Sequence, residues 1–300
     1  MKKNVLIVGY GSIGRRHAKI LKKLKQIDNI YILSKQNNIP FKKVSSLQNV
    51  EKLNIDYIII SSETSKHFYY LNFFEKNLKN KLILVEKPLF EKYRKFRIIN
   101  NKVFVGYNMR FNPIIFLIKK IINKEKFWSI NITCGSYLPM WRKNIDYKNS
   151  SSAKRKTGGG VLLDLSHELD YIQWLFGKIK LDYVYLNKLS DLKISTEDFL
   201  SLSGKTKRSK RLQLELNYFS KNTTRRIIAD GKNLSLNIDL IEKKIDIINK
   251  NKHQTIYKKF DRDLSYKMQH LSLLNGNFKD CCSFKDGLNL MKLIEKIRKF

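Results

Sequence analysis

The sequence is poor in several features that would assign it to particular classes of protein. It has three cysteines in 300 residues, Cys134, Cys281 and Cys282, and the adjacent pair lacks the spacing of zinc ligands. We therefore expect a reduced, cytoplasmic compartment and no structural metal. No apolar run approaches the roughly 18 residues of a membrane span. The apolar stretch behind Met1-Lys2-Lys3 is too short for a signal peptide and runs straight into glycines, so we expect no export signal.

Acidic residues are also scarce, with 26 Asp and Glu against 60 Lys and Arg, which gives a formal net charge of +34. Proteins that bind nucleic acid can carry such a charge, but they usually concentrate it on one face or arm. Here the lysines are spread along the whole chain, and the densest cluster, Lys205–Arg211, is interpreted as a solvated loop between two strands. We expect the charge to attract phosphorylated or carboxylated small molecules, and we expect no nucleic acid and no membrane as partners.

Glycine is uncommon as well, with 13 in all, yet three glycines lie close together near the start. Val5–Val8 is an apolar run typical of a strand buried on both faces, and apolar spacing typical of a helix follows from Ile13 to Leu24. Between them, Gly9, Gly11 and Gly14 have the spacing G-x-G-x-x-G. Such a turn admits a dinucleotide pyrophosphate at the helix N-terminus, although an ordinary strand-to-helix turn has the same order of elements.

The end of the second predicted strand bears on the choice of cofactor. Proteins that prefer NAD often place an acidic residue there, on the ribose hydroxyls. This chain has Leu33-Ser34-Lys35 at that point, with no carboxylate to repel a phosphate. Because Ser34 and Lys35 can hold a 2′-phosphate, the sequence favours NADP, with NAD as the alternative.

The first hundred or so residues alternate between strand-like and helix-like patterns. The expected strands include Ile30–Leu33, Asp56–Ile60, Leu82–Val85 and Lys102–Val105, and Phe68–Leu78 has helical apolar spacing. This alternation predicts a parallel sheet with helices on both faces. Right-handed crossovers would bring the carboxyl ends of the strands to one edge, where a ligand crevice forms.

Later segments alternate apolar and polar residues, which indicates strands with one buried face. They are Trp128–Cys134, with Trp128 on the buried face, Leu212–Tyr218, and Leu234–Leu240 after a turn expected at Asp230-Gly231. These strands predict a largely antiparallel sheet. One face of that sheet would pack on helices, while the other is solvated or used in oligomerisation.

The C-terminal segment carries the signature of a capped helix. Ser283 and Asp286 have the spacing of a capping box. The apolar residues expected to share one face of the helix are Leu290, Leu293, Ile294 and Ile297. We divide the chain into domains 1–111 and 112–300, with helix 284–299 able to pack back on the first domain.

Two segments supply candidate proton-transfer groups. Glu86-Lys87-Pro88 follows a predicted strand, and the proline biases Lys87 towards extended backbone, although a surface lysine before a turn has the same sequence. In the run from Gly158 to Gly177, Asp164, His167 and Asp170 are spaced three apart and are expected to share one side of a helix. A histidine beside a carboxylate suits a proton donor or acceptor, although an isolated helix histidine is usually structural.

Three further segments offer ligand contacts. Asn108 and Arg110 lie at the passage between the two predicted domains, where Arg110 can bind an anionic or hydroxylated substrate and Asn108 the nicotinamide region. The run Ser61–His67 ends another strand and can supply hydroxyls to the same crevice. Trp141 can stack on a sugar face and Arg142 can bind a phosphate or carboxylate, although both also suit a packed loop.

The chain carries, in this order, the motifs GYGSIGRRHAKIL, SSETSKH, EKP, GYNMRFNP and GGGVLLDLSHELDYIQWLFG. Together they resemble the Gfo/Idh/MocA family of NAD(P)-dependent sugar and cyclitol dehydrogenases. The resemblance covers nearly the whole chain. It implies an α/β fold, with an N-terminal Rossmann domain (a doubly wound parallel sheet). A C-terminal α+β domain with an open, largely antiparallel sheet would follow, often as an oligomer interface.

The resemblance also implies an activity and its residues. Lys87 and His167 would be catalytic and Asp164 would support them, although many members place this Asp and His four apart instead of three. The implied reaction passes hydride between nicotinamide and a hydroxyl or ketone of a sugar or nucleotide sugar, with surface-glycan sugars among the candidates. The implied assembly is a homodimer or homotetramer. The alternative is a non-catalytic regulator of the same fold that binds cofactor or sugar.

The residues expected at each site are then as follows. Expected cofactor contacts are Gly9, Gly11, Ser12, Ile13, Gly14, Ser34, Lys35, Ser61, Thr64, His67, Glu86, Lys87 and Asn108. Expected substrate contacts are Arg110, Trp141, Arg142, Asp164 and His167.

Overall fold

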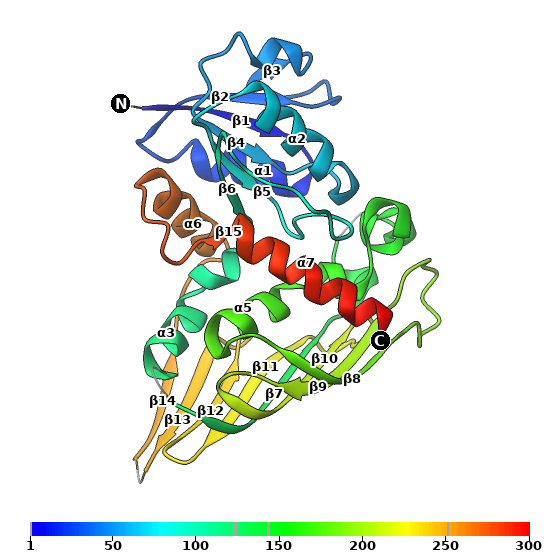
Figure 1. The fold of residues 1–300 in the computed structure, drawn as a ribbon, viewed down its shortest axis with the longest axis vertical. Coiled ribbons are helices and arrows are strands. Elements are labelled where there is room, and N and C mark those ends of the chain that lie inside the picture. Colours follow the sequence, from blue (N-terminus) through cyan, green and yellow to red (C-terminus); the bar gives the residue numbers. More distant parts are fainter. Residues whose placement is uncertain (1, 123–124, 143–144, 251) are drawn as a thin grey trace. The chain divides into compact units, whose positions relative to one another are not determined.

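A computed structural model describes residues 2–122, 125–142, 145–250 and 252–300 (Figure 1). Its contacts divide the chain into two compact units, each continued by a later segment. Unit 1 contains the chain up to Phe111 together with Arg262–Lys292, and unit 2 contains Asn112–Asp261 with Leu293–Phe300. The domain boundaries expected from the sequence, 1–111 and 112–300, stay a prediction.

Unit 1 is built on a seven-stranded sheet in the order β15-β6-β5-β4-β1-β2-β3, parallel except for β15. The strands are β1 (Lys3–Val8), β2 (Ile27–Leu33), β3 (Lys42–Val44), β4 (Tyr57–Ile60), β5 (Leu82–Val85), β6 (Lys102–Val105) and β15 (Cys282–Ser283). The helices are α1 (Ser12–Leu21), α2 (His67–Asn77) and α6 (Leu264–Leu274), with 3-10 turns η1 (Gln48–Val50), η2 (Thr64–Lys66) and η3 (Asn108–Phe111). This confirms the predicted doubly wound parallel sheet.

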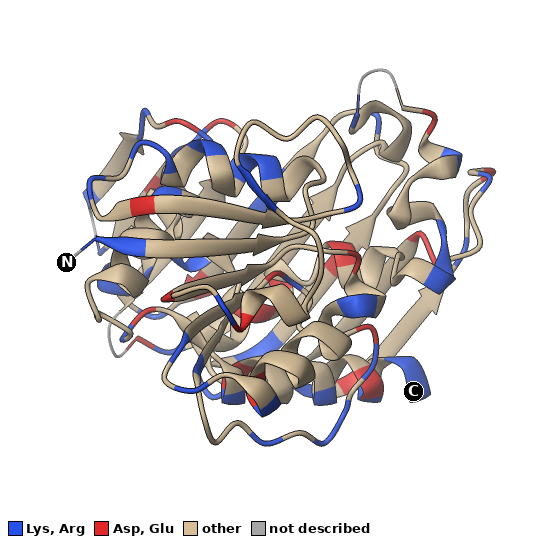
Figure 2. Cartoon of the chain, turned by 90° about the horizontal axis from the view of Figure 1, so that it is seen from above, with Lys and Arg blue, Asp and Glu red and all other residues tan. Residues whose placement is uncertain are grey.

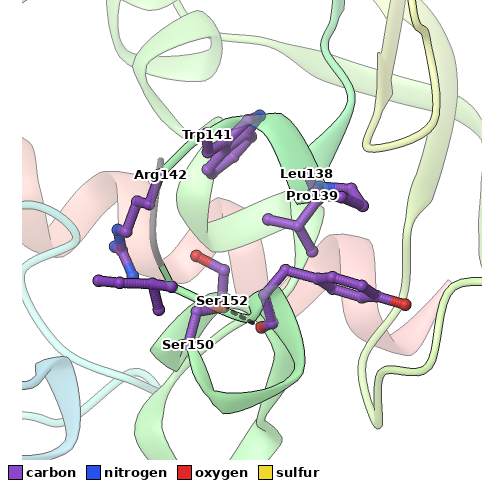
Figure 3. A pocket seen from close by; sticks show the side chains of 8 residues that line it. Leu138, Pro139, Trp141, Arg142, Ser150 and Ser152 are labelled. Atoms are coloured by element: carbon purple, nitrogen blue, oxygen red, sulfur yellow. Dashed lines mark hydrogen bonds between the residues drawn. The ribbon is translucent and has the colours of Figure 1, made fainter.

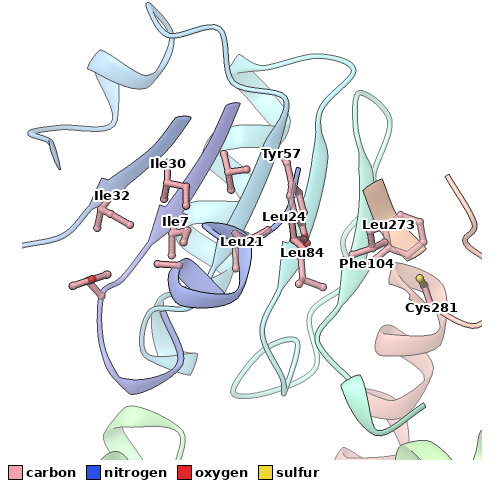
Figure 4. Close-up of a cluster of buried hydrophobic side chains, with 14 residues drawn as sticks. Ile7, Leu21, Leu24, Ile30, Ile32, Tyr57, Leu84, Phe104, Leu273 and Cys281 are labelled. Carbon is pink, nitrogen blue, oxygen red and sulfur yellow. The ribbon is translucent and has the colours of Figure 1, made fainter. Parts of the chain in front are cut away.

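Helices cover the sheet of unit 1 because its strands are apolar on both faces. Val5, Ile7 and Ile59 form one buried cluster with Leu21 of α1 and Leu273 of α6 (Figure 4). Their neighbours in the strands point to the opposite face and are also fully buried, among them Leu6, Ile58 and Ile83. A parallel sheet covered in this way has one accessible place for a ligand, the edge where its strands end.

Unit 2 contains an eight-stranded sheet in the order β14-β13-β12-β11-β7-β10-β9-β8, in which only β7 and β10 pair in parallel. The strands are β7 (Phe127–Gly135), β8 (Lys180–Asn187), β9 (Phe199–Lys205), β10 (Ser209–Asn217), β11 (Thr224–Gly231), β12 (Leu234–Asp239), β13 (Lys244–Asn249) and β14 (Lys252–Tyr257). The predicted alternation is confirmed in β10, where Leu212, Leu214 and Leu216 are buried while Gln213 is exposed and Glu215 is half-buried.

Short helices accompany this sheet. They are α3 (Pro113–Ile122), α4 (Val161–Asp164) and α5 (His167–Phe176), with 3-10 turns η4 (Leu138–Met140), η5 (Tyr147–Asn149), η6 (Ser151–Ala153) and η7 (Arg155–Thr157). Helix α7 (Phe284–Lys299) begins in unit 1 and ends in unit 2. Its capping box is confirmed, because Asp286 N–H donates to Ser283 Oγ at 3.1 Å while Ser283 N–H donates back to Asp286 Oδ2 at 3.3 Å. Among the described helices, none is both long and apolar enough to cross a membrane.

Two details of the β7–β11 ladder differ from the prediction. Trp128 is 55% exposed and Phe127 takes the buried position, because the register shifts by a bulge opposite Asp230 and Gly231. The bulge adds one residue to β7 and turns Trp128 outwards. The turn expected at Asp230-Gly231 also lies further along, since both residues belong to β11 and the bend is at residues 232–233.

The basic cluster Lys205–Arg211 is not a loop alone. It comprises the end of β9, a turn at residues 206–208 and the start of β10. Lys and Arg occur on helices, strands and loops of both units and are not collected on one element (Figure 2). The distribution agrees with the spread of lysines along the sequence.

The bulge can be tested with two adjacent aromatic residues. Phe127→Ala is expected to lower the free energy of unfolding by about 3–5 kcal/mol, because a buried ring is lost and a cavity remains. Trp128→Ala is expected to change it by less than about 1 kcal/mol, because most of that ring is in water. Urea unfolding of both variants checks this, and a larger loss for Trp128→Ala would contradict the register.

Candidate active site

The glycine turn of unit 1 has the geometry that its spacing predicts. Gly9 follows β1 with φ at +92°, a conformation that side chains disfavour. A Cβ on Gly14 would lie 2.1 Å from the Gly9 carbonyl oxygen, so α1 passes too close to the turn for any side chain there. A Cβ on Gly11 would meet nothing within 4 Å. The backbone of Gly11 therefore faces open space while its neighbours are packed.

This cradle fits the pyrophosphate of a dinucleotide. No side chain caps the first turn of α1, and that turn contains no acidic residue. The N–H groups at the start of a helix attract anions, the more so where no carboxylate competes for them. Ser12 and Ile13 form the first turn of α1 and are positioned to offer these N–H groups.

The end of β2 is polar and lacks acidic side chains. Gln36 N–H donates to Ser34 Oγ at 3.2 Å, and Lys35 is exposed. Arg15 was missed by the sequence reasoning: its guanidinium donates to Gln36 Oε1 at 2.9 Å and lies 5.6 Å from the centre of the Tyr10 ring. The position of Arg15, one residue after Gly14 on the exposed side of α1, is the sequence signal that could have predicted a role near the glycine turn.

The segment after β4 closes the other side of the glycine turn. Ser61 Oγ donates to the carbonyl oxygen of Gly9 at 3.0 Å, which ties the two strand ends together. His67 is buried, with one ring nitrogen 3.1 Å from the Pro88 carbonyl oxygen and the other 3.1 Å from that of Ser62. Burial lowers the pKa of His67. Its ring links the loops after β4 and β5, and Thr64 begins η2, which lies between β4 and α2.

Glu86 and Lys87 come directly after β5. Glu86 is buried, and its Oε2 accepts the Lys87 N–H at 3.3 Å while its Oε1 lies 3.0 Å from His17 Nε2. The Glu86 carboxylate thus turns towards α1 and into unit 1. Lys87 is half-buried, and its peptide bond to Pro88 is cis.

Asn108 and Arg110 are buried and bonded to the later segment of unit 1. Asn108 Nδ2 donates to Ser265 Oγ at 2.9 Å. One guanidinium nitrogen of Arg110 donates to the Cys281 carbonyl oxygen at 3.3 Å and to Asp286 at 3.4 Å. These bonds hold α6, β15 and the start of α7, a task that the sequence reasoning did not foresee because the partners lie more than 150 residues away.

In unit 2, the segment expected to be one helix is two. Helix α4 ends at Asp164 and α5 begins at His167, with a turn at Leu165 and Ser166 between them. The expectation that Asp164, His167 and Asp170 share one side of a continuous helix is therefore wrong. Gly160 starts α4 at φ +113°, and a Cβ there would lie 2.2 Å from Glu197 Oε1. The close packing at Gly160 fixes where α4 begins.

Asp164 has a partner that the sequence reasoning assigned to the core. The Tyr218 hydroxyl donates to Asp164 Oδ2 at 2.7 Å. Burial raises the pKa of Tyr218, and the nearby Asp164 carboxylate raises it further. The Trp141 ring meets the Tyr218 ring edge-on at 5.2 Å, and its Nε1 donates to Ser136 Oγ at 2.9 Å.

Trp141 and Arg142 also line a small pocket in unit 2 (Figure 3). Leu138, Pro139, Ile145, Tyr147, Ser150 and Ser152 complete the lining. Ser150 Oγ donates to the Tyr147 carbonyl oxygen at 2.6 Å, which fixes one wall. The volume of this cavity is only about 10 Å³, less than a sugar needs, so the sugar contact expected of Trp141 and Arg142 stays a prediction.

The predicted site residues thus fall into two groups. All the expected cofactor contacts, with Arg110, lie in unit 1, and Asp164, His167, Trp141 and Arg142 lie in unit 2. Within unit 1, the glycine turn, Ser61 and Glu86 share one edge of the sheet. A meeting of Lys87 with His167 stays a prediction.

Two family models match this chain. One is an oxidoreductase family with an NAD-binding Rossmann fold, over residues 3–100, and the other is the C-terminal alpha/beta domain of the same family, over residues 119–299. The chain belongs to the Gfo/Idh/MocA family of oxidoreductases. This identification confirms the resemblance drawn from the motifs, and it makes the glycine turn of unit 1 part of an NAD-binding domain.

Several solved structures show the same fold at low identity. Levoglucosan dehydrogenase in complex with NADH has a TM-score of 0.84 and 14% identity, covering 100% of this chain and 96% of that one. WlbA dehydrogenase from Bordetella pertussis, in complex with NADH and UDP-GlcNAcA, has a TM-score of 0.79 and 15% identity over 99% and 95%. UDP-N-acetylglucosamine 3-dehydrogenase GnnA from Acidithiobacillus ferrooxidans has a TM-score of 0.75 and 13% identity, covering 100% of this chain and 97% of that one. No curated protein sequence matches the chain.

The glycine turn of this family member gives a matched pair of variants. Gly11→Ala is expected to leave thermal stability nearly unchanged, because its Cβ meets open space. It should weaken NADH binding at least about tenfold, because the methyl group occupies the approach of the phosphates. Gly14→Ala is expected to lower the melting temperature, because its Cβ would overlap the Gly9 carbonyl.

Fluorescence titration with NADH and thermal unfolding measure the two effects separately. If Gly11→Ala bound NADH as tightly as the parent protein, the cradle would not be the pyrophosphate site.

Proposed function

We propose that the protein is an NAD(P)-dependent oxidoreductase that interconverts a CH–OH group and a ketone on a sugar or nucleotide sugar. The observation that carries this proposal is the glycine turn of an NAD-binding domain, placed on the same sheet edge as Glu86 and Lys87. When bound, the nicotinamide cofactor supplies the hydride acceptor or donor. The protein is left with binding, alignment and the hydroxyl proton.

Lys87 and His167 are proposed to share the proton work. Oxidation of an alcohol removes a hydride from carbon and a proton from oxygen, and that proton needs an acceptor within hydrogen-bond reach. An imidazole accepts it near neutral pH, and an ammonium stabilises the oxygen as negative charge develops. Asp164 is assigned a supporting part, since Tyr218 already donates to its carboxylate.

Two lines of support favour a sugar that carries negative charge. The protein has a formal net charge of +34, which attracts anions over a distance. Among the solved structures of the same fold, one is named for UDP-N-acetylglucosamine and one is in complex with UDP-GlcNAcA. We therefore place nucleotide sugars first in the substrate class and propose Arg110, Trp141 and Arg142 as residues that contact them.

The exposed face of the unit 2 sheet is proposed as a contact between copies in a homo-oligomer. It carries large apolar side chains that are at least about a third exposed, namely Trp128, Tyr183, Tyr185, Ile228 and Ile248. Surface patches of this kind are typical of protein contacts.

The catalytic proposal predicts the behaviour of two variants. Lys87→Met and His167→Asn are each expected to lower kcat by about 10²-fold or more, because each removes a group that handles the proton. Cofactor binding should persist, because the glycine turn is untouched. Steady-state turnover with a panel of sugars and nucleotide sugars measures the first effect and NADH titration the second.

Near-normal turnover in both variants would reject the assignment. NADH binding without turnover of any panel member, together with binding of a sugar, would favour a non-catalytic regulator instead.

The cofactor preference gives a separate prediction. Ser34 and Lys35 offer a hydroxyl and an ammonium where NAD-specific proteins often have a carboxylate, so NADP⁺ is expected to bind about tenfold more tightly than NAD⁺. Ser34→Asp should reverse the order by repelling the 2′-phosphate. Parallel titrations of both cofactors check this, and a marked NAD⁺ preference of the parent protein would overturn it.

A further inference from the structure

Unit 1 contains four buried ionisable side chains joined in an unbroken chain of hydrogen bonds. Tyr57 Oη lies 2.9 Å from His270 Nδ1, and His270 Nε2 lies 2.8 Å from His17 Nδ1. His17 Nε2 then lies 3.0 Å from Glu86 Oε1. The four residues come from β4, α6, α1 and the end of β5, and all four are buried.

The chemistry of the groups gives this chain a direction. Burial raises the pKa of Tyr57, so its hydroxyl keeps its proton. Burial lowers the pKa of His270, and the neighbouring His17 lowers it further, so His270 is neutral. A carboxylate can only accept. With Glu86 as the carboxylate, Nε2 of His17 donates to it, Nε2 of His270 donates to His17, and the Tyr57 hydroxyl donates to His270.

The last member of the chain is the residue before Lys87. The Oε1 atom of Glu86 bonds to His17, and its Oε2 atom accepts the Lys87 backbone N–H at 3.3 Å. A Cβ on Gly106 would lie 2.6 Å from Glu86 Oε1, so the end of β6 confines the carboxylate from the other side. The orientation of Glu86 is thereby passed to the backbone of Lys87.

Two further titratable side chains packed near this carboxylate interact with it electrostatically, Tyr266 and His67. Burial, together with the charge of Glu86, raises the pKa of Tyr266 in α6 to about 12. Burial lowers the pKa of His67 in α2, and the charge of Glu86 acts in the opposite direction. Arg16 of α1 is paired with Asp263 at 3.1 Å and lies over the Tyr266 ring.

We propose that His17 and His270 are positioning residues for Lys87, acting through Glu86. This inference rests on the proposed function, because only a catalytic Lys87 requires its ammonium group to be held in a particular orientation. Four polar groups at the centre of a domain cost desolvation energy that apolar side chains of similar size would not. Their completed chain fixes the orientation of the Glu86 carboxylate, because one of its oxygens bonds to His17 and the other to the Lys87 N–H.

The first test examines the chain itself and needs neither substrate nor cofactor. The protein labelled with ¹⁵N-histidine is studied by NMR at pH 8, and the five histidine signals are assigned with single His→Gln variants. We expect His17 and His270 to be protonated at Nε2 and bare at Nδ1. A doubly protonated His17 would donate to His270 Nε2 and move the His270 proton to Nδ1, but it would still keep Glu86 an acceptor and support the proposal. A neutral His17 protonated at Nδ1 would make Glu86 the donor and overturn it.

The second test breaks the chain in the middle. In His270→Phe, the reaction of Lys87 with acetic anhydride, measured by mass spectrometry relative to the other lysines, is expected to change at least about threefold. Turnover of the substrate found in the panel should fall about tenfold in kcat with the KM for NADH unchanged, because a small misplacement of a reacting group is costly. His270→Gln can still donate to His17, so its Lys87 labelling and its kcat should both return most of the way to those of the parent protein.

The matched control is His253→Phe, since His253 is an exposed histidine of β14 in unit 2. It should leave Lys87 labelling and kcat as in the parent protein. A folded His270→Phe with unchanged Lys87 labelling and kcat, but a lower melting temperature, would assign the chain a merely structural role and overturn the proposal.

Two provisions keep the tests decisive. If His270→Phe does not fold, Tyr57→Phe removes one hydroxyl from the end of the chain and should leave His270 protonated at Nε2. A switch of that proton to Nδ1 together with unchanged Lys87 labelling would count against the proposal. If no sugar is turned over, the oxidoreductase proposal fails, while the NMR and labelling results still decide whether the chain orients Lys87.

Discussion

The paired register of the parallel strands in unit 1 is the constraint on which the candidate site depends. Ser61 N–H donates to the Val8 carbonyl, Glu86 N–H to that of Ile60, and Gly106 N–H to that of Val85. Each strand therefore ends at the same level as its neighbour. The turn at Gly9, the hydroxyl of Ser61 and the carboxylate of Glu86 meet at one edge because four short apolar strands end together.

Features that depend on near neighbours in the chain could be predicted from the sequence. The strands β5 and β6 have the expected bounds, and the capping box of α7 has the expected reciprocal bonds. The glycine turn also has the expected roles for Gly9, Gly11 and Gly14. In each case a pattern of a few residues fixes the conformation, so no knowledge of distant contacts is needed.

Features that depend on distant partners could not be predicted. The sequence predicted Arg110 as an anion-binding residue but gave no sign that its guanidinium also bonds to the Cys281 carbonyl oxygen and to Asp286. Trp128 fitted the alternation of β7, but a bulge set by the neighbouring strand β11 turned it outwards. The spacing of Asp164 and His167 also did not reveal the turn that separates α4 from α5. The contact that fixes the start of α4, Gly160 against Glu197, joins residues more than 30 positions apart.

His17 shows why the two kinds of information must be combined. In the sequence it occupies an apolar position of α1, where a leucine would satisfy the helical pattern equally well. Only the fold brings it within 3.0 Å of Glu86 and 2.8 Å of His270. A side chain with two nitrogens on opposite sides of its ring can join two partners at once, which a leucine cannot do. The polar residue is therefore explained by the connection it makes, and the connection ends beside Lys87.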